Sequence, residues 1–144
     1  MAVNEKRLDK FFDSVQKTVE TAMQKTGEEF IKNARDSVTE SIYNRPVERK
    51  PWDLTGNLRN SIGYAVKKDG TLLFQANGGG DGGQRAKEVV MREGNKDTCL
   101  VLTAGMEYAA AVESRGYDVV SNSVNHAADI YPRRVQMFLK ALLR

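Results

Sequence analysis

The chain has 144 residues, of which 40% are hydrophobic and 28% are charged, so it can form one domain with its own core. Its 22 lysine and arginine residues and 19 aspartate and glutamate residues are mixed along the chain, and the net charge of +3 gives no support for nucleic-acid binding. No apolar run reaches the length of a membrane span, and the first residues lack the apolar segment of a signal peptide. We therefore expect a single cytosolic domain over 1–144, with no membrane partner.

A long amphipathic helix is predicted over residues 1–43. From Leu8 to Ile42 the apolar residues recur every three or four positions, and the residues between them are mostly charged or hydroxylic. Thr26 and Glu29 could form a capping box around Gly27, which would split the helix there. The apolar stripe keeps its phase across Gly27, however, and this favours one helix with a weak point.

The length of this helix raises the question of what covers its first turns. About 40 helical residues span roughly 60 Å, whereas a compact domain of this size is only about 38 Å across. Either the N-terminal part projects and packs its apolar stripe, with Phe11 and Phe12, on another subunit, or the helix breaks near Gly27 and folds back. The pattern leaves both alternatives open.

Two prolines separate this helix from the rest of the chain. Pro46 and Pro51 indicate an extended linker over 44–54. Residues 55–144 then form an α+β body, which begins with a short helical turn over 57–60.

The body contains a β-hairpin. Strands are predicted over 62–66 and 71–76, and Asp69 and Gly70 between them can adopt the positive φ angles of a tight turn. A third strand follows over 98–105. We expect a small, mainly antiparallel sheet.

A run of glycines follows the hairpin. Gly78, Gly80 and Gly83 have the G-x-G-x-x-G spacing of a dinucleotide-binding loop. We reject that function, because the preceding strand is a hairpin arm and too little chain remains for the other strands of that fold. We expect a flexible loop over 77–84, followed by a short middle helix that ends at Gly94.

The last part of the chain ends in a helix. Residues 106–116 fit either a strand or a helix. A helix is predicted from Ser121, and Pro132 should kink or restart it. The predicted fold class is therefore α+β, with a long N-terminal helix, a small mainly antiparallel sheet, a short middle helix and a C-terminal helix.

The reactive side chains form no pattern typical of an enzyme. We expect Cys99 to be a small buried apolar residue, and we expect His126, the only histidine, to lie on a helix face. Glu107 and Glu113 read as solvated or ion-paired carboxylates. We therefore expect no catalytic, metal-binding or cofactor-binding residues. The C-terminal helix has a basic face, which consists of Arg133, Arg134, Lys140 and Arg144. We expect this face to be exposed to solvent; the alternative is that it contacts DNA or an acidic partner.

Two segments resemble the tail-completion proteins of long-tailed bacteriophages, a family of minor tail or neck components. WDLTGNLRNSIGYAV resembles the family signature D-T-G-x-L-R-x-S-I, and AGMEYAAAVESRGYDVV resembles its Y-A-x-Y-V-E-x-G segment. The matching positions of the first are Leu54, Thr55, Gly56, Leu58, Arg59, Ser61 and Ile62. Those of the second are Tyr108, Ala109, Val112, Glu113, Gly116, Tyr117, Asp118 and Val119. The family's usual P-F-L-x-P-A ending is absent.

The resemblance implies a structural role in virion assembly and no catalysis. Such proteins complete or join the neck and tail as a ring around the DNA channel, of six or more copies, assembled in the host cytoplasm and retained in the virion. The partners implied are further copies, neighbouring neck or tail proteins and, in passing, DNA. As subunit contacts we expect Phe11, Phe12, Gly78, Gly79, Gly80, Asp81, Gly82 and Gly83. The alternative is a small cytosolic protein that binds nucleotides or nucleic acid.

Overall fold

The computed structural model describes residues 5–39, 57–104 and 121–143. Their helices and strands are, in chain order, α1 (Glu5–Val38), α2 (Asn57–Asn60), β1 (Ile62–Lys68), β2 (Thr71–Ala76), α3 (Gly80–Arg92), β3 (Thr98–Ala104) and α5 (Ser121–Leu142). The strands form one sheet in the order β2-β1-β3, and β1 pairs antiparallel with both neighbours. The predicted α+β fold class is confirmed.

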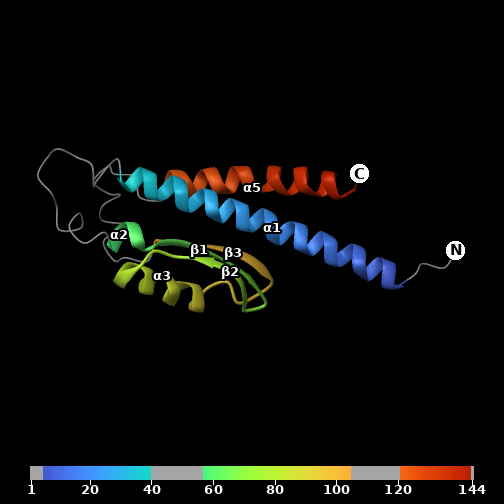
Figure 1. Cartoon of the computed structure of the whole chain (residues 1–144), viewed down its shortest axis with the longest axis horizontal. Helices are drawn as coiled ribbons and strands as arrows, with labels where there is room; N and C mark the ends of the chain where they lie inside the picture. The colour runs from blue at the N-terminus through green and yellow to red at the C-terminus, as the bar shows by residue number, and fades with distance from the viewer. Residues whose placement is uncertain (1–4, 40–56, 105–120, 144) are drawn as a thin grey trace, which may run out of the picture.

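Helix α1 lies between α5 and the sheet, and α3 covers the opposite face of the sheet (Figure 1). The two long helices run in opposite directions, so the C-terminus of α5 lies toward the N-terminal half of α1. The central strand β1 is buried along nearly its whole length. The apolar core lies mainly between α1 and the sheet; its largest fully buried apolar side chains are Phe30, Leu58, Ile62, Val38 and Val66.

Helix α1 is one unbroken helix of 34 residues, which corresponds to about 51 Å. The favoured interpretation of one helix is therefore confirmed, and the alternative of a break near Gly27 with a capping box is wrong. Thr26 Oγ1 donates a hydrogen bond to the carbonyl oxygen of Ala22 inside the helix, and Glu29 binds side chains of α5. Gly27 instead allows close packing, because the ring of Tyr64 on β1 lies directly against it.

The hairpin between β1 and β2 has the predicted turn. Asp69 and Gly70 have φ angles of 49° and 84°, which belong to the left-handed region expected for such a turn. Beside the turn, Lys68 pairs with Thr71, and further along Tyr64 pairs with Ala76. The hairpin signal was reliable because it depends on residues adjacent in the sequence.

The glycine run differs from the predicted loop. Helix α3 begins at Gly80, inside the run, and Gly82 and Gly83 are buried in its first turn. A Cβ atom on Gly83 would lie 1.9 Å from the carbonyl oxygen of Gly78. Gly78 in turn donates its N–H to the carbonyl oxygen of Asn60, at 3.2 Å. The loop prediction for 77–84 is therefore wrong from Gly80 onward.

Lys67 on β1 closes the C-terminal end of α3. Its buried ammonium group donates to the carbonyl oxygens of Val90 (2.7 Å) and Glu93 (2.9 Å) and to Oδ1 of Asn95 (2.5 Å). These contacts use all three donors of the ammonium group, whose charge faces the negative end of the helix dipole. The side chain thus holds α3 against the sheet.

We expect Lys67→Met to lower the free energy of unfolding by about 2 kcal/mol, because it leaves buried carbonyl oxygens without a donor. The neighbouring Lys68 is exposed, so Lys68→Met should change it by no more than about 0.5 kcal/mol. Urea denaturation of both variants measures the difference. Equal losses would contradict a specific role of Lys67 at the helix end.

Helix α5 runs from Ser121 to Leu142 without a restart. Pro132 lies inside it, so of the two predicted effects, a kink or a restart, the restart does not occur. Ser123 and Ala127 are its buried residues, and α1 is the described element on which it mainly rests. One side of α5 therefore packs on α1, while other parts of it remain accessible.

Candidate functional site

The described residues show no group of three or more histidine, cysteine, aspartate or glutamate side chains that could hold a metal ion. His126 lies on α5 and contacts Glu29 of α1, whereas the Cys99 thiol on β3 donates to the carbonyl oxygen of Lys96. Glu107 and Glu113 lie outside the described residues.

The glycine fingerprint is explained by packing within the chain. Strand β2 before it is a hairpin arm, and β1 separates β2 from β3 in the sheet. A dinucleotide-binding loop needs a crevice between strands of a parallel sheet, which this arrangement does not provide. A Cβ atom on Gly78 would lie 2.5 Å from Cα of Asn60. Gly78 thus allows close packing on Asn60 at the end of α2, and Gly83 allows close packing of the first turn of α3 on Gly78.

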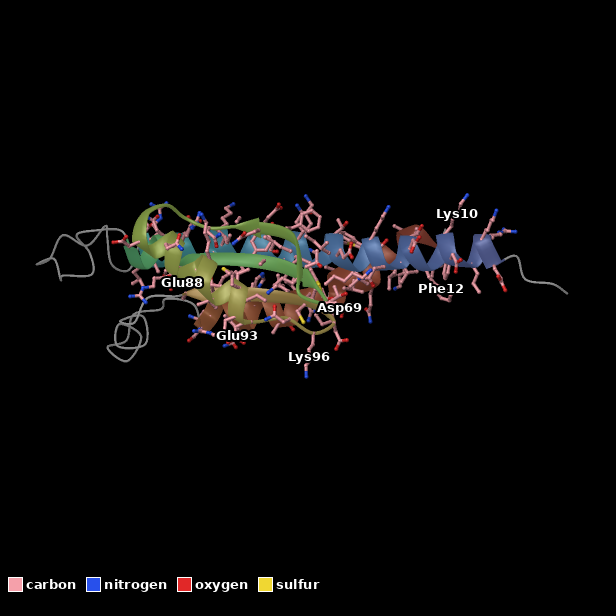
Figure 2. All side chains as sticks on the ribbon, turned by 90° about the horizontal axis from the view of Figure 1, so that it is seen from below. Lys10, Phe12, Asp69, Glu88, Glu93 and Lys96 are labelled. Carbon is pink, nitrogen blue, oxygen red and sulfur yellow. The ribbon has the colours of Figure 1, made fainter. Side chains whose placement is uncertain are left out.

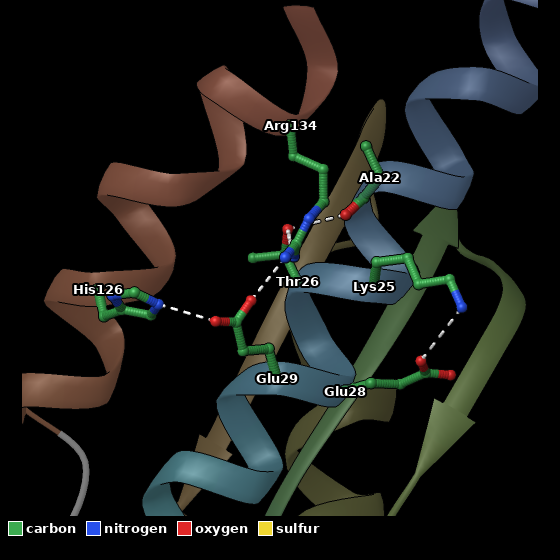
Figure 3. A network of polar contacts seen from close by, with 7 residues as sticks. All are labelled: Ala22, Lys25, Thr26, Glu28, Glu29, His126 and Arg134. Atoms are coloured by element: carbon green, nitrogen blue, oxygen red, sulfur yellow. Dashed lines mark hydrogen bonds and ion pairs between the residues drawn. The ribbon is translucent and has the colours of Figure 1, made fainter. Parts of the chain in front are cut away.

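A polar network joins α1 and α5 at the middle of the helix pair (Figure 3). Glu29 accepts hydrogen bonds from Arg134 (Nη2 to Oε2, 2.6 Å), and its other oxygen lies 2.9 Å from Nε2 of His126. Arg134 also donates to Oγ1 of Thr26, at 3.1 Å. The hydrogen bond from Arg134 has the largest effect on the pKa of Glu29, which it lowers, and the hydrogen bond from His126 lowers it further. The network therefore holds Glu29 in its charged form.

The predicted basic face of α5 is smaller than expected. Arg134 turns toward α1 and is only 19% exposed, so its assignment to a solvated face is wrong. Arg133 is exposed and lies 3.7 Å from the Asp129 carboxylate one turn earlier. Lys140 is also exposed, and Arg144 lies outside the described residues. The sequence could not reveal the orientation of Arg134, because its partner Glu29 is more than 100 positions away.

The network should contribute to stability in a pH-dependent way. Because the pKa of Glu29 is lowered from its ordinary 4.5, its contribution is present above pH 4.5 and is lost as the pH falls through the folded-state value. We expect Glu29→Gln to lower the free energy of unfolding by about 1 kcal/mol at pH 7, since the pair is partly screened by solvent. The difference from the unmodified chain should shrink toward pH 3, as urea denaturation at several pH values can measure.

Glu28→Gln is the matched control for that variant. Glu28 is the neighbouring residue, and it pairs only loosely with Lys25, at 3.9 Å between exposed side chains. Its replacement should cost no more than about 0.5 kcal/mol. A pH-independent loss in Glu29→Gln would contradict the role of the charged carboxylate.

Of the first resemblance motif, the structure buries Leu58, Ser61 and Ile62 completely. Ser61 Oγ donates to the carbonyl oxygen of Leu58, at 2.6 Å, and so stabilises the turn from α2 into β1. Arg59 between them is exposed. The remaining positions of this motif, Leu54, Thr55 and Gly56, lie outside the described residues, as does the entire second motif from Tyr108 to Val119.

An exposed apolar surface lies at the N-terminal end of α1. Leu8 is 41% exposed, Phe11 43% and Phe12 58%, although these side chains belong to the apolar stripe of the helix. The rings of Phe11 and Phe12 lie 6.0 Å apart between centroids. This end of α1 extends beyond the sheet (Figure 1). It provides the accessible apolar area that a contact with another protein requires.

The C-terminal end of α5 also carries exposed apolar side chains. Met137 is 60% exposed and Leu143 65%. Between the two helices lies a groove of about 430 Å³, lined from α5 by Phe138, Ala141 and Leu142. None of the described helices is both long and apolar enough to cross a membrane. Among the described residues, the exposed apolar ends of α1 and α5 and the groove between these helices are the candidate binding surfaces.

Comparison with protein families agrees with the resemblance. Residues 4–114 match the HK97-gp10-like family, whose description reads "Bacteriophage HK97-gp10, putative tail-component". The match includes α1 and the whole described sheet and ends before α5. No curated protein and no solved structure matches the chain.

Proposed function

Because the chain belongs to the HK97-gp10-like family of phage tail components, we propose that it is a structural protein that completes or joins the tail and neck during morphogenesis. Its copies form a ring around the DNA channel, of six or more subunits as the sequence resemblance implies. It assembles in the host cytoplasm and remains in the virion. Its partners are further copies and neighbouring neck or tail proteins, with passing contact to DNA.

The observation that supports a role in assembly is the exposed end of α1. A long helix that carries Phe11 and Phe12 beyond its own sheet leaves apolar area in water, and this area is stabilised only when another chain covers it. A ring requires contacts between two different patches on each copy, repeated around an axis. The family assignment provides the setting in which such contacts occur.

We expect Phe11→Ser/Phe12→Ser to remain folded, because both side chains are already exposed, but to be lost from phage particles. Mass spectrometry of particles from a complemented deletion strain measures incorporation, and light scattering after size exclusion measures oligomer size. Lys10→Ser is the control, since Lys10 points away from Phe12 across the helix (Figure 2). A folded double variant that enters particles normally would contradict this role of the α1 end.

A further inference from the structure

A second accessible groove is lined by residues of β2 and α3. Helix α3 lies on the side of the sheet away from α1 (Figure 1). The groove has a volume of about 390 Å³, and its walls include Leu72 of β2 and Met91 of α3, which are 46% and 78% exposed. Val90 contributes further apolar surface. The described lining contains Lys67 and Lys87 and no carboxylate. The groove is therefore apolar between its strand and helix walls, and Lys87 gives it a positive edge, since the Lys67 ammonium group is buried at the end of α3.

The projecting end of α1, residues 5–15, carries apolar side chains with an acidic edge beside them, while its basic residues Lys6, Arg7 and Lys10 lie at other positions around the helix. This segment lies N-terminal to Gln16, whose side chain contacts the sheet by donating a hydrogen bond to Oγ1 of Thr98 on β3, at 2.9 Å. Phe12 is its most exposed large apolar side chain. Glu5, Asp9 and Asp13 follow one another at intervals of four residues, so they form an acidic edge along one face of the helix, next to Phe12.

We propose that the projecting end of one copy docks in the β2–α3 groove of the next copy. Phe12 lies between Leu72 and Met91, and the acidic edge faces Lys87. The inference rests on the proposed ring, because a ring needs two different patches that meet from copy to copy. The groove between α1 and α5 is lined by α1 itself, just after the projecting end. A self-complementary contact there would join two copies about a two-fold axis and end at a dimer.

Disulfide cross-linking of the full chain tests this contact. Cys99→Ser removes the only cysteine, and Phe12→Cys and Met91→Cys then introduce one thiol on each proposed patch. After oxidation we expect a ladder of covalent dimers, trimers and larger species, because every copy offers both patches. Lys10→Cys with Met91→Cys is the control and should give no ladder, since Lys10 lies across the helix from Phe12. A covalent dimer from Phe12→Cys alone, without the ladder, would establish the two-fold contact and overturn the proposal.

A charge pair provides an independent test. Phe12→Glu, which places a charge between the apolar walls of the groove, and Met91→Glu, which removes an apolar wall and lowers the positive charge of the groove, should each reduce the oligomer fraction at least tenfold. Phe12→Lys combined with Met91→Glu should restore it. Rings that form without the ladder and without charge rescue would overturn this contact and leave the proposed function standing. A chain that forms no rings and enters no particles would contradict the proposed function itself, and the contact with it.

Discussion

Replacement of Gly83 by alanine is expected to destabilise the protein by about 3 kcal/mol, which is near the upper end of the usual cost of overpacking. Alanine is the better helix former by about 1 kcal/mol, so propensity alone predicts the opposite sign. The steric term decides, because the new Cβ atom would lie 1.9 Å from the carbonyl oxygen of Gly78. A backbone atom cannot rotate away as a side chain can.

The surroundings of Gly78 prevent an easy adjustment. Its N–H donates to the carbonyl oxygen of Asn60, and a Cβ atom on Gly78 itself would lie only 2.5 Å from Cα of Asn60. Moving the first turn of α3 away would therefore separate it from α2. The first turn of α3 and the end of α2 are held by one close backbone contact.

Gly79→Ala is the matched control for this prediction. Gly79 belongs to the same glycine run, but a Cβ atom there would have nothing within 4 Å, and its φ of −89° suits any residue. We expect Gly79→Ala to change the free energy of unfolding by no more than about 0.5 kcal/mol. Urea denaturation of the two variants separates the alternatives. Two equally mild variants would restore the interpretation of the glycine run as a flexible loop.

Local signals explain which elements could be predicted from the sequence. The hairpin depends on Asp69 and Gly70, whose positive φ angles are a property of the turn itself. The apolar periodicity of α1 likewise predicts which face of the helix is buried where it packs on the sheet, since Phe30, Ala34 and Val38 all lie in the core. These features require no knowledge of distant residues.

The errors arose where a distant residue determines the role of a local motif. Thr26 and Glu29 have the spacing of a capping box, but Arg134 of α5 binds both of them within a continuous helix. The glycine run has the letters of a phosphate-binding loop, but Asn60 occupies the space that Gly78 leaves free. The composition of a segment does not identify the residues that will pack on it.

The exposed surfaces could be predicted only in part. The excess length of α1 left two alternatives for Phe11 and Phe12, a projecting end or a helix folded back, and the structure has both side chains exposed on a continuous helix. The β2–α3 groove could not be predicted, because Leu72 and Met91 belong to different elements and read as ordinary apolar positions in each. A surface formed by two elements requires their relative placement.

Replacement of Gly27 by alanine is also expected to cost about 3 kcal/mol, through a side chain instead of the backbone. The new Cβ atom would lie 2.3 Å from Cδ2 and 2.5 Å from Cγ of the Tyr64 ring. Cγ is the ring atom nearest the strand, so a rotation of the ring does not remove the overlap. Tyr64 is also buried, at 3% exposure, on the central strand. Either α1 or β1 must move.

A double-mutant cycle with Tyr64→Ala tests that cause directly. In the Tyr64→Ala background the ring is absent, so Gly27→Ala should become neutral or should stabilise by up to about 1 kcal/mol, as helix propensity predicts. Urea denaturation of the four chains gives the coupling energy. Thr21→Ala, at an exposed position of the same helix, controls for general effects and should remain within about 0.5 kcal/mol. If Gly27→Ala is equally destabilising without the ring, close packing on Tyr64 is not the reason for glycine at this position.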